Sequence, residues 1–322
     1  MTALGAPRRV LVTGARGYIG ALVVERLAAR AGALTKLVAA DVRAATPGER
    51  RADVEYLQLD VRDPSLAAVL SERGIESVVH LAAIVSPGPG SSAALEYSVD
   101  VEGTRNVLEA CVSAGVRHLI VTSSGAAYGY HADNPPALSE DCPLRGNDEF
   151  PYAKHKRLVE EMLARYRQSH PELGQLVFRP GTVLGASTSN QITNLFEKRV
   201  VLGLDGAATP FVFVWDQDVV ECIVLGVVGE KTGIYNLAGH GVMTLREIAA
   251  RLRKPYVSLP PAVVARALGL MSRLGLTRYG PEQVRFLQYR PVLANRRLEQ
   301  EFGYRLRLTS REVFELYAEG RT

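Results

Sequence analysis

Short apolar segments alternate with helix-forming segments over the first 180 residues, and this alternation constrains the fold more than any other feature. The apolar segments, which are the expected strands, are 10–14, 36–41, 54–60, 77–83, 118–124 and 175–180. Between them, apolar residues recur at helical spacing in 20–31, 65–73, 98–114 and 152–168. This pattern is typical of βαβ units, and strands that are apolar on both faces belong inside a parallel sheet. We therefore predict an α/β fold with a doubly wound parallel sheet.

The composition supports a large folded core and excludes several other classes of protein. Apolar residues make up 47% of the 322 residues and charged residues 22%, which excludes a disordered or collagen-like chain. The 38 basic and 34 acidic residues leave a net charge of +4 without a run of five like charges, so we expect no nucleic-acid partner. The spacing of Cys111, Cys142 and Cys222 matches neither a disulfide framework nor a zinc site.

A glycine-rich segment, residues 13–20, follows the first expected strand and opens the first expected helix. Its glycines permit a tight turn and a close approach of the backbone to a pyrophosphate, and the helix N-terminus supplies N–H donors. An unliganded strand-to-helix turn is the alternative. The residues that we expect to bind a dinucleotide here are Gly14, Gly17, Tyr18, Ile19 and Gly20.

Asp41 ends the second expected strand, where a carboxylate can accept hydrogen bonds from an adenosine ribose. It favours NAD over NADP, because a 2′-phosphate would meet a like charge. Arg16 and Arg43 argue for the reverse, since either can neutralise that phosphate. Asp60 closes the third expected strand and either reaches the adenine amino group or caps the following turn. We predict NAD as the cofactor.

Three residues form a candidate catalytic set. Tyr152 and Lys156 are four residues apart in an expected helix, so their side chains share one face. A phenol is a poor base at neutral pH, but an ammonium and a nicotinamide cation close by stabilise its phenolate and lower its pKa. Ser124 ends the fifth expected strand and is placed to hydrogen-bond the reacting oxygen of a substrate. The set predicts proton transfer coupled to hydride transfer.

The histidines are expected to have structural roles. His155 lies off the face that Tyr152 and Lys156 share, and we expect it on the surface. His80 and His118 lie in or beside apolar strands, where we expect them to be buried and hydrogen-bonded. No group of residues has the spacing of metal ligands, so no metal site is expected.

After residue 180 the pattern changes to loops, short helices and few strands, which predicts a second domain. We expect a nucleotide-binding domain over 1–180 and a smaller mixed α/β substrate domain over 181–322. A strand over 211–215 and a helix over 217–228 lie in a segment, 211–230, that is expected to pack back onto the first domain. No stretch approaches the roughly 20 apolar residues of a membrane span, and the N-terminus lacks a signal peptide, so we expect a cytoplasmic protein.

Residues 261–276 are expected to form an amphipathic helix. Its apolar residues at three- and four-residue steps are Val264, Leu268, Met271 and Leu274. Arg266 and Arg273 lie off that stripe. Core packing, a cover over an apolar substrate and a face that lies on a membrane all remain open.

Taken together, these segments resemble the extended short-chain dehydrogenase/reductase superfamily and, more narrowly, its NAD-dependent epimerase/dehydratase family. The resemblance rests on TGARGYIG (13–20), Asp41, Asp60-Val61, HLAA (80–83), VEGTRNVLEAC (101–111), TSSGAAYG (122–129), YAKHK (152–156), FRPGTVLG (178–185) and YNLAG (235–239). It implies a Rossmann domain, a C-terminal substrate domain, and Ser124, Tyr152 and Lys156 as catalytic residues. It also implies homodimers formed through helices near 100–114 and 152–168. The further cofactor contacts that it implies are Asp60, Val61, Leu81, Ala82, Ala83, Tyr152 and Lys156.

Two departures from the family pattern concern the chemistry. Asp100 stands where the family usually has asparagine, which puts a proton relay there in doubt. Gly125-Ala126 stand where sugar-nucleotide 4,6-dehydratases have an Asp-Glu pair, so dehydration is not expected.

Two further departures concern the substrate. Thr209-Pro210 replace an arginine that clamps the substrate diphosphate in many epimerases. The candidate substitutes are Arg199, Arg246, Arg285 and Arg290. Trp215 stands where relatives often have histidine, and it either lines the substrate site, together with Ser124 and Tyr152, or packs within its strand.

We expect an NAD(H)-dependent enzyme that transfers hydride at a secondary alcohol or ketone of a small molecule. A nucleotide-sugar 4-epimerase is the first expectation, because that is the family's commonest use. The alternative is a net dehydrogenase or ketoreductase that acts on an apolar, steroid-like or polyketide-like substrate. A non-catalytic nucleotide sensor on the same fold is a third class, which the presence of both Tyr152 and Lys156 disfavours.

Overall fold

The computed structural model describes residues 8–30, 32–88, 90–277 and 280–320, which group into two compact units. Unit 1 takes in the chain up to Ser124 together with His155–Arg179 and Asp216–Tyr235. Unit 2 takes in Gly125–Lys154, Pro180–Trp215 and the chain from Asn236 onward. The units interleave along the chain, so the expected division into domains at residue 180 stays a prediction.

Unit 1 is built on a seven-stranded sheet with the order β11-β6-β5-β4-β1-β2-β3. The strands are β1 (Arg8–Thr13), β2 (Leu34–Asp41), β3 (Glu55–Gln58), β4 (Ser77–His80), β5 (His118–Thr122), β6 (Gly174–Pro180) and β11 (Gly233–Leu237). All neighbouring pairs from β3 to β6 run parallel. The strand order reverses beside β1, with β2 on one side and β4 on the other, which confirms the doubly wound parallel sheet.

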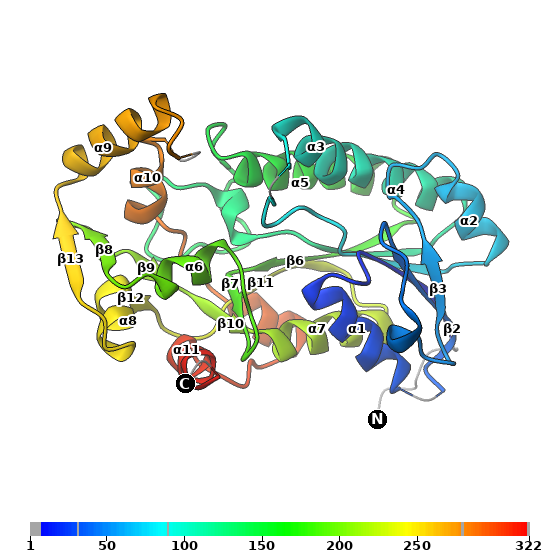
Figure 1. Cartoon of the computed structure of the whole chain (residues 1–322). Coiled ribbons are helices and arrows are strands. Elements are labelled where there is room, and N and C mark those ends of the chain that lie inside the picture. The colour runs from blue at the N-terminus through cyan, green and yellow to red at the C-terminus, as the bar shows by residue number, and fades with distance from the viewer. Residues whose placement is uncertain (1–7, 31, 89, 278–279, 321–322) are drawn as a thin grey trace. The chain divides into compact units, whose positions relative to one another are not determined.

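Helices cover both faces of this sheet, as Figure 1 shows. The helices of unit 1 are α1 (Tyr18–Ala28), α2 (Leu66–Glu72), α3 (Ala93–Tyr97), α4 (Gly103–Ser113), most of α5 (Pro151–Ser169), and α7 (Asp216–Gly229). α1 and α7 lie on one face, and α4 and α5 lie on the other. A core cluster packs α4 and α5 against the sheet, with fully buried side chains such as Leu108 of α4, Leu119 of β5 and Leu163 of α5.

The expected helix over 98–114 is helical from Ser98 to Ser113, but it begins with a π turn. A π-helical turn, Ser98–Glu102, separates α3 from α4, and it carries the buried Asp100. The Oγ1 of Thr104 donates to the Asp100 carbonyl at 2.6 Å, and the Asp100 carboxylate accepts the N–H of Ile84 at 2.8 Å. These two hydrogen bonds, which are additional to the backbone hydrogen bonds of the helix, stabilise the π turn. Such turns are frequent at functional sites.

Unit 2 contains short elements around an aromatic core. Its strands form pairs: β10 (Phe213–Trp215) with β7 (Thr182–Leu184), β12 (Met243–Thr244) with β9 (Pro210–Phe211), and β13 (Tyr256–Leu259) with β8 (Val201–Leu204). Its helices are α6 (Gln191–Glu197), α8 (Leu245–Arg251), α9 (Pro261–Arg273), α10 (Gln283–Gln288) and α11 (Ser310–Glu319). Short 3-10 turns at Gly125–Tyr128 here and Pro47–Glu49 in unit 1, and a π turn at Leu298–Phe302, complete the elements. The expected strand 211–215 is wrong as one element, because β9 and β10 pair with different partners on either side of Val212.

Candidate functional site

The glycine-rich loop follows β1 at the point where the strand order reverses. Gly14 has φ 64°, and a Cβ there would lie 2.7 Å from the backbone nitrogen of Ala82 in the loop after β4. A Cβ at Gly20 would collide with the carbonyl oxygen of Gly14. Only glycine fits at these two positions, because β1, α1 and the loop after β4 approach so closely. The ends of β1 and β4 therefore form a bare backbone cradle at the switch point, where open α/β sheets bind ligands.

The N-terminus of α1 faces this cradle without a cap of its own. Gly17 is the N-cap, no side chain caps the helix, and its first turn carries no acidic residue. The predicted Tyr18 and Ile19 are the first two residues of α1, so their N–H groups precede the regular helix ladder. The Tyr18 hydroxyl donates to the Asp216 carboxylate of α7. The uncapped donors and the helix dipole fit the pyrophosphate of NAD.

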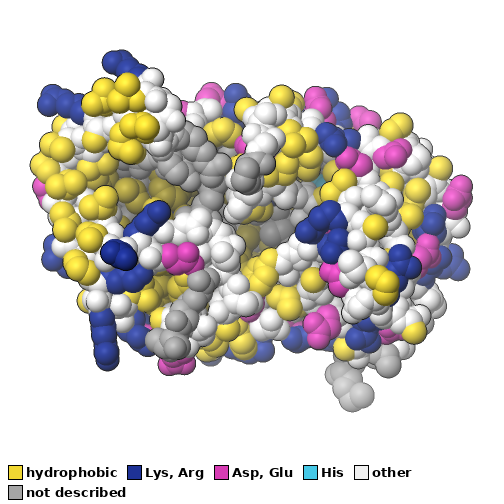
Figure 2. Space-filling model, viewed as in Figure 1, with side chains coloured by type: hydrophobic (Ala, Val, Ile, Leu, Met, Phe, Trp, Pro, Cys, Tyr) yellow, Lys and Arg dark blue, Asp and Glu magenta, His cyan; other side chains and the backbone are white. Residues whose placement is uncertain are grey.

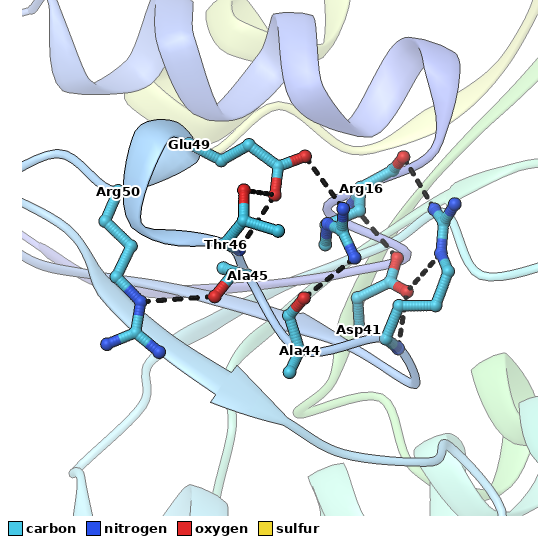
Figure 3. Close-up of polar contacts among 8 residues, drawn as sticks. Arg16, Asp41, Ala44, Ala45, Thr46, Glu49 and Arg50 are labelled. Carbon is cyan, nitrogen blue, oxygen red and sulfur yellow. Dashed lines mark hydrogen bonds and ion pairs between the residues drawn. The ribbon is translucent and has the colours of Figure 1, made fainter.

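Asp41 is buried at the end of β2, and its carboxylate is held by two arginines (Figure 3). It accepts the backbone N–H of Arg16 at 2.9 Å and the N–H and Nε–H of Arg43 at 3.0 and 3.2 Å. The Arg16 guanidinium instead donates to Ala44 O and pairs with Glu49 at 2.8 Å. Hydrogen bonds from Thr46 and then Arg16 lower the pKa of Glu49 to about 2. Arg16 is thus already paired, and Arg43 is the cation closest to the Asp41 carboxylate.

The other predicted cofactor contacts lie around the same edge of the sheet. Leu81, Ala82 and Ala83 are half-buried in the loop after β4, and Val61 is buried after β3. The Asp60 carboxylate accepts the N–H of Arg62 at 2.9 Å and its Nη2–H at 2.6 Å, and these bonds lower the pKa of Asp60. Asp60 therefore caps its own turn, which was one of its two predicted roles.

Lys156 and Ser124 belong to unit 1, and Tyr152 belongs to unit 2. Lys156 is buried, and its Nζ donates to the carbonyl of Thr122, the last residue of β5. Burial lowers the pKa of Lys156, and the carboxylate of Asp100 opposes that shift. Ser124 is half-buried two residues beyond Thr122, and Tyr152 is half-buried one helical turn before Lys156 in α5. The roles of these three side chains stay a prediction.

His155 is buried, so its expected surface position is wrong. Its Nδ1 lies 3.0 Å from the Asp100 carboxylate, and its ring packs edge-on against Tyr97 at 5.6 Å between centroids. This pair could not be predicted from the sequence, because Asp100 lies 55 residues away on the π turn. A polar cavity of about 10 Å³, the size of one water molecule, lies between Asp100, Lys156 and Thr122.

His80 and His118 are buried and hydrogen-bonded, which confirms their structural roles. The two nitrogens of His80 contact Thr13 Oγ1 at 2.8 Å and Thr104 Oγ1 at 3.0 Å. Burial lowers the pKa of His80 to about 3. His118 contacts Ser77 Oγ and the Lys231 carbonyl. Among the described residues no group of histidine, cysteine and carboxylate side chains has the arrangement of a metal site.

Of the four arginines proposed for a substrate anion, Arg290 stands apart. Arg199 and Arg246 are exposed, and Arg285 pairs with Glu149 at 3.1 Å. Arg290 lies between aromatic rings, 4.0 Å from the centroid of Phe211 and 4.7 Å from that of Phe286. Its Nη2 contacts Thr182 Oγ1 at 3.3 Å, but its Nε and Nη1 are buried with no hydrogen-bond partner among the described residues.

Tyr152 packs against the same aromatic group as Arg290. Tyr130, Phe150 and Phe286 contact one another at ring centroid distances of 5.0 to 6.4 Å, and Tyr152 borders this cluster. Burial raises the pKa of Tyr130 to about 12, and burial lowers that of Arg290 to about 10. The buried guanidinium lacks a carboxylate partner among the described residues, and a buried charge of this kind is costly unless an anion binds it.

Trp215 is half-buried at the end of β10 and borders the aromatic core of unit 2. The Arg307 guanidinium lies 4.4 Å from its ring centroid, a cation–π contact. At Gly125, where dehydratases have an acidic residue, a Cβ would lie 2.9 Å from the Leu293 Cδ1, so a larger residue would require the Leu293 side chain to shift.

The parallel sheet and the glycine cradle define a dinucleotide-binding enzyme of the extended short-chain dehydrogenase/reductase type. Residues 10–238 match the NAD dependent epimerase/dehydratase family, and the chain belongs to that family. NAD is the cofactor of this family.

Similar proteins include characterised and uncharacterised members. An uncharacterized protein of Mycobacterium tuberculosis is 25% identical over 319 residues, which cover 98% of this chain and 84% of that protein. The UDP-glucose 4-epimerase of Mycolicibacterium smegmatis is 32% identical over 234 residues, or 67% of this chain and 72% of that protein. The solved Thermus thermophilus UDP-glucose 4-epimerase in complex with NAD has a TM-score of 0.73 and 25% identity, and covers 97% of this chain and 98% of its own.

Proposed function

We propose that this protein is an NAD-dependent epimerase that inverts a secondary alcohol of a nucleotide sugar. The observation that carries the proposal is Arg290, whose Nε and Nη1 are buried without a partner among the described residues. Its guanidinium lies against Phe286, which belongs to the aromatic cluster that Tyr152 borders. A diphosphate supplies the oxygen acceptors that this guanidinium lacks, and a planar fork binds phosphate in a bidentate manner. A substrate anion bound at Arg290 would hold the rest of the substrate near Tyr152.

In this proposal Tyr152 takes the proton of the substrate hydroxyl and later returns it to the oxygen. NAD supplies the hydride acceptor and donor when it is bound. The buried ammonium of Lys156 stabilises the phenolate of Tyr152 from the next turn of α5, because opposite charge lowers the pKa of a phenol. Ser124 donates a hydrogen bond to the reacting oxygen and fixes its orientation. The half-buried ring of Trp215 provides an apolar or stacking wall for the substrate.

A net dehydrogenase of an apolar alcohol is the second candidate. Thr209-Pro210 in place of the usual arginine favours it, because the buried Thr209 supplies no charge for a diphosphate. The aromatic cluster around Arg290 then fits the apolar body of a substrate with a single carboxylate.

Calorimetric titration with UDP separates the two candidates. We expect UDP to bind, and Arg290→Met to weaken that binding by about ten- to a hundredfold, the value of one or two charge-assisted hydrogen bonds. Arg285→Met is the matched control and should bind UDP normally, because Arg285 is exposed and pairs with Glu149. NAD binding should not change in either variant. Absence of UDP binding by the unaltered protein would favour the dehydrogenase.

We further propose that the protein is a cytoplasmic homodimer, as the resemblance implies through the helices near 100–114 and 152–168. Among the described residues, no helix is long and apolar enough to cross a membrane. Sedimentation velocity tests the dimer, and a monomer at micromolar concentration would contradict it.

A further inference from the structure

α9 presents apolar side chains to the solvent instead of burying them. None of its residues is buried, and Val263, Leu270 and Leu274 at its C-cap are 49, 60 and 63% exposed. Steps of four and seven residues align these three side chains along one line of the helix. Figure 2 shows the apolar side chains gathered over α9, with Lys and Arg side chains projecting beside them. The expectation of core packing for this helix is therefore wrong for its outer face.

The exposed apolar surface continues past the C-terminal end of α9. Leu276, two residues after the C-cap, is 70% exposed. We call Val263, Leu270, Leu274 and Leu276 the α9 surface. An exposed apolar set of this kind marks an interaction site.

The charged side chains of α9 have one sign. Arg266 and Arg273 are the charged residues of Pro261–Arg273, and the helix contains no acidic residue. Arg266 and Arg273 are seven residues apart, so they follow one edge of the apolar line. No ion pair joins either of them to a carboxylate of the described residues. The α9 surface therefore combines an apolar strip with an unneutralised positive edge.

We propose that the α9 surface binds the surface of a lipid bilayer that contains anionic lipids. An amphipathic helix of this composition lies in the plane of the interface, with its apolar line among the acyl chains and its arginines at the lipid phosphates. The long apolar stems of Arg266 and Arg273 allow their charges to reach the headgroups while the helix sinks.

The size of the helix favours a bilayer over a second copy of the chain. Thirteen residues make a helix about 20 Å long and about 10 Å wide, so its outer face covers about 200 Å². A stable protein interface needs about 800 Å² on each partner. A bilayer sets no such requirement, because a few inserted side chains and two charges suffice for reversible binding.

Cosedimentation of the full chain with phospholipid vesicles tests this proposal. The probes are vesicles of phosphatidylcholine alone and of equal parts phosphatidylcholine and phosphatidylglycerol. We expect binding to the anionic vesicles at least tenfold tighter than to the neutral ones, and weaker binding at high salt because screening shortens the range of the charges. Leu270→Ser/Leu274→Ser should reduce anionic binding at least tenfold, and Arg266→Glu/Arg273→Glu should remove the preference for anionic lipid.

Matched variants outside the α9 surface are Leu95→Ser, an exposed leucine of α3, and Arg305→Glu, an exposed arginine. Both should bind vesicles like the unaltered protein, and NAD binding in every variant should report an intact fold. Equal binding of the unaltered protein to both kinds of vesicle, or to neither, would overturn the proposal. So would a change of oligomeric state in the double leucine variant without vesicles, because the helix would then be a contact between subunits.

Discussion

Replacement of Asp41 tests the cofactor site most directly. The unaltered carboxylate lies at the end of β2, where its charge opposes a 2′-phosphate. Two unit charges about 5 Å apart at a protein surface interact by about 3 kcal/mol. The Nε of Arg43, 3.2 Å from the Asp41 carboxylate, offsets part of that repulsion. We therefore expect Asp41 to disfavour NADP by about 1.4 to 3 kcal/mol, which is about a ten- to hundredfold loss of affinity.

The variant Asp41→Ser should reverse the preference for NAD over NADP. It removes the repulsion and the contact between Asp41 and Arg43, so that Arg43, whose side chain is 58% exposed and whose Nη2 donates to the Arg16 carbonyl, can turn toward a phosphate. NADP affinity should rise at least tenfold, and NAD affinity should fall because the ribose loses its acceptor. Titration calorimetry with both cofactors measures the two changes. Asp53→Ser is the control, since Asp53 is an exposed partner of Arg51 away from the loop. Equal NAD and NADP affinities in the unaltered protein, or an unchanged NADP affinity in the variant, would refute the reasoning.

Three further predictions concern single side chains. Tyr152→Phe should remove most turnover and leave NAD binding nearly unchanged, as measured by steady-state assay and calorimetry; full turnover in the variant would exclude the proposed acid/base role. Glu160→Leu should destabilise the fold by about 3 to 5 kcal/mol in urea denaturation, because it removes the buried carboxylate that lies 2.6 Å from the buried Arg179. A loss below about 1 kcal/mol would mean that water or another group satisfies Arg179. Because the pKa of His80 is about 3 in the folded protein and about 6.5 in the unfolded chain, unfolding takes up a proton between these pH values. The contribution of His80 to the free energy of unfolding should therefore fall by about 1.4 kcal/mol per pH unit as the pH falls from about 6.5 toward 3. The stability difference between the unaltered protein and His80→Gln should therefore shrink on acidification, and a difference independent of pH between 7 and 5 would contradict the burial of a neutral ring.

The sequence predicted the sheet well because local periodicity determines it. Apolar runs such as the one ending at Asp41 became strands within a few residues of the expected bounds, and the glycine spacing placed the loop that follows β1. The glycine pattern is local, and only glycine tolerates the close approach to Ala82. The glycine spacing can therefore be recognised from the sequence, although the contact with Ala82 that requires it joins distant segments.

The features that were missed depend on contacts between distant segments. His155 was expected on the surface because it lies off the face that Tyr152 and Lys156 share, but its partner is Asp100 on another segment. Among the candidate arginines, only the rings of Phe211 and Phe286 distinguish Arg290. The exposure of Leu270 was equally hidden, because an amphipathic pattern shows that a helix has two faces and does not show which face the fold covers.

The hydrogen bonds around His80 run in one direction only. The Thr104 hydroxyl donates to the Asp100 carbonyl, so it accepts the proton on His80 Nε2, and His80 Nδ1 must then accept from the Thr13 hydroxyl. Every donor in the series points from β1 toward the π turn, which fixes a single tautomer of the ring. Moving a proton along this line would require all the hydroxyls to reverse together. These hydrogen bonds therefore connect β1, the strand before the glycine loop, to the π turn that holds His155. They fix the position of the π turn relative to β1 and do not conduct a proton between them.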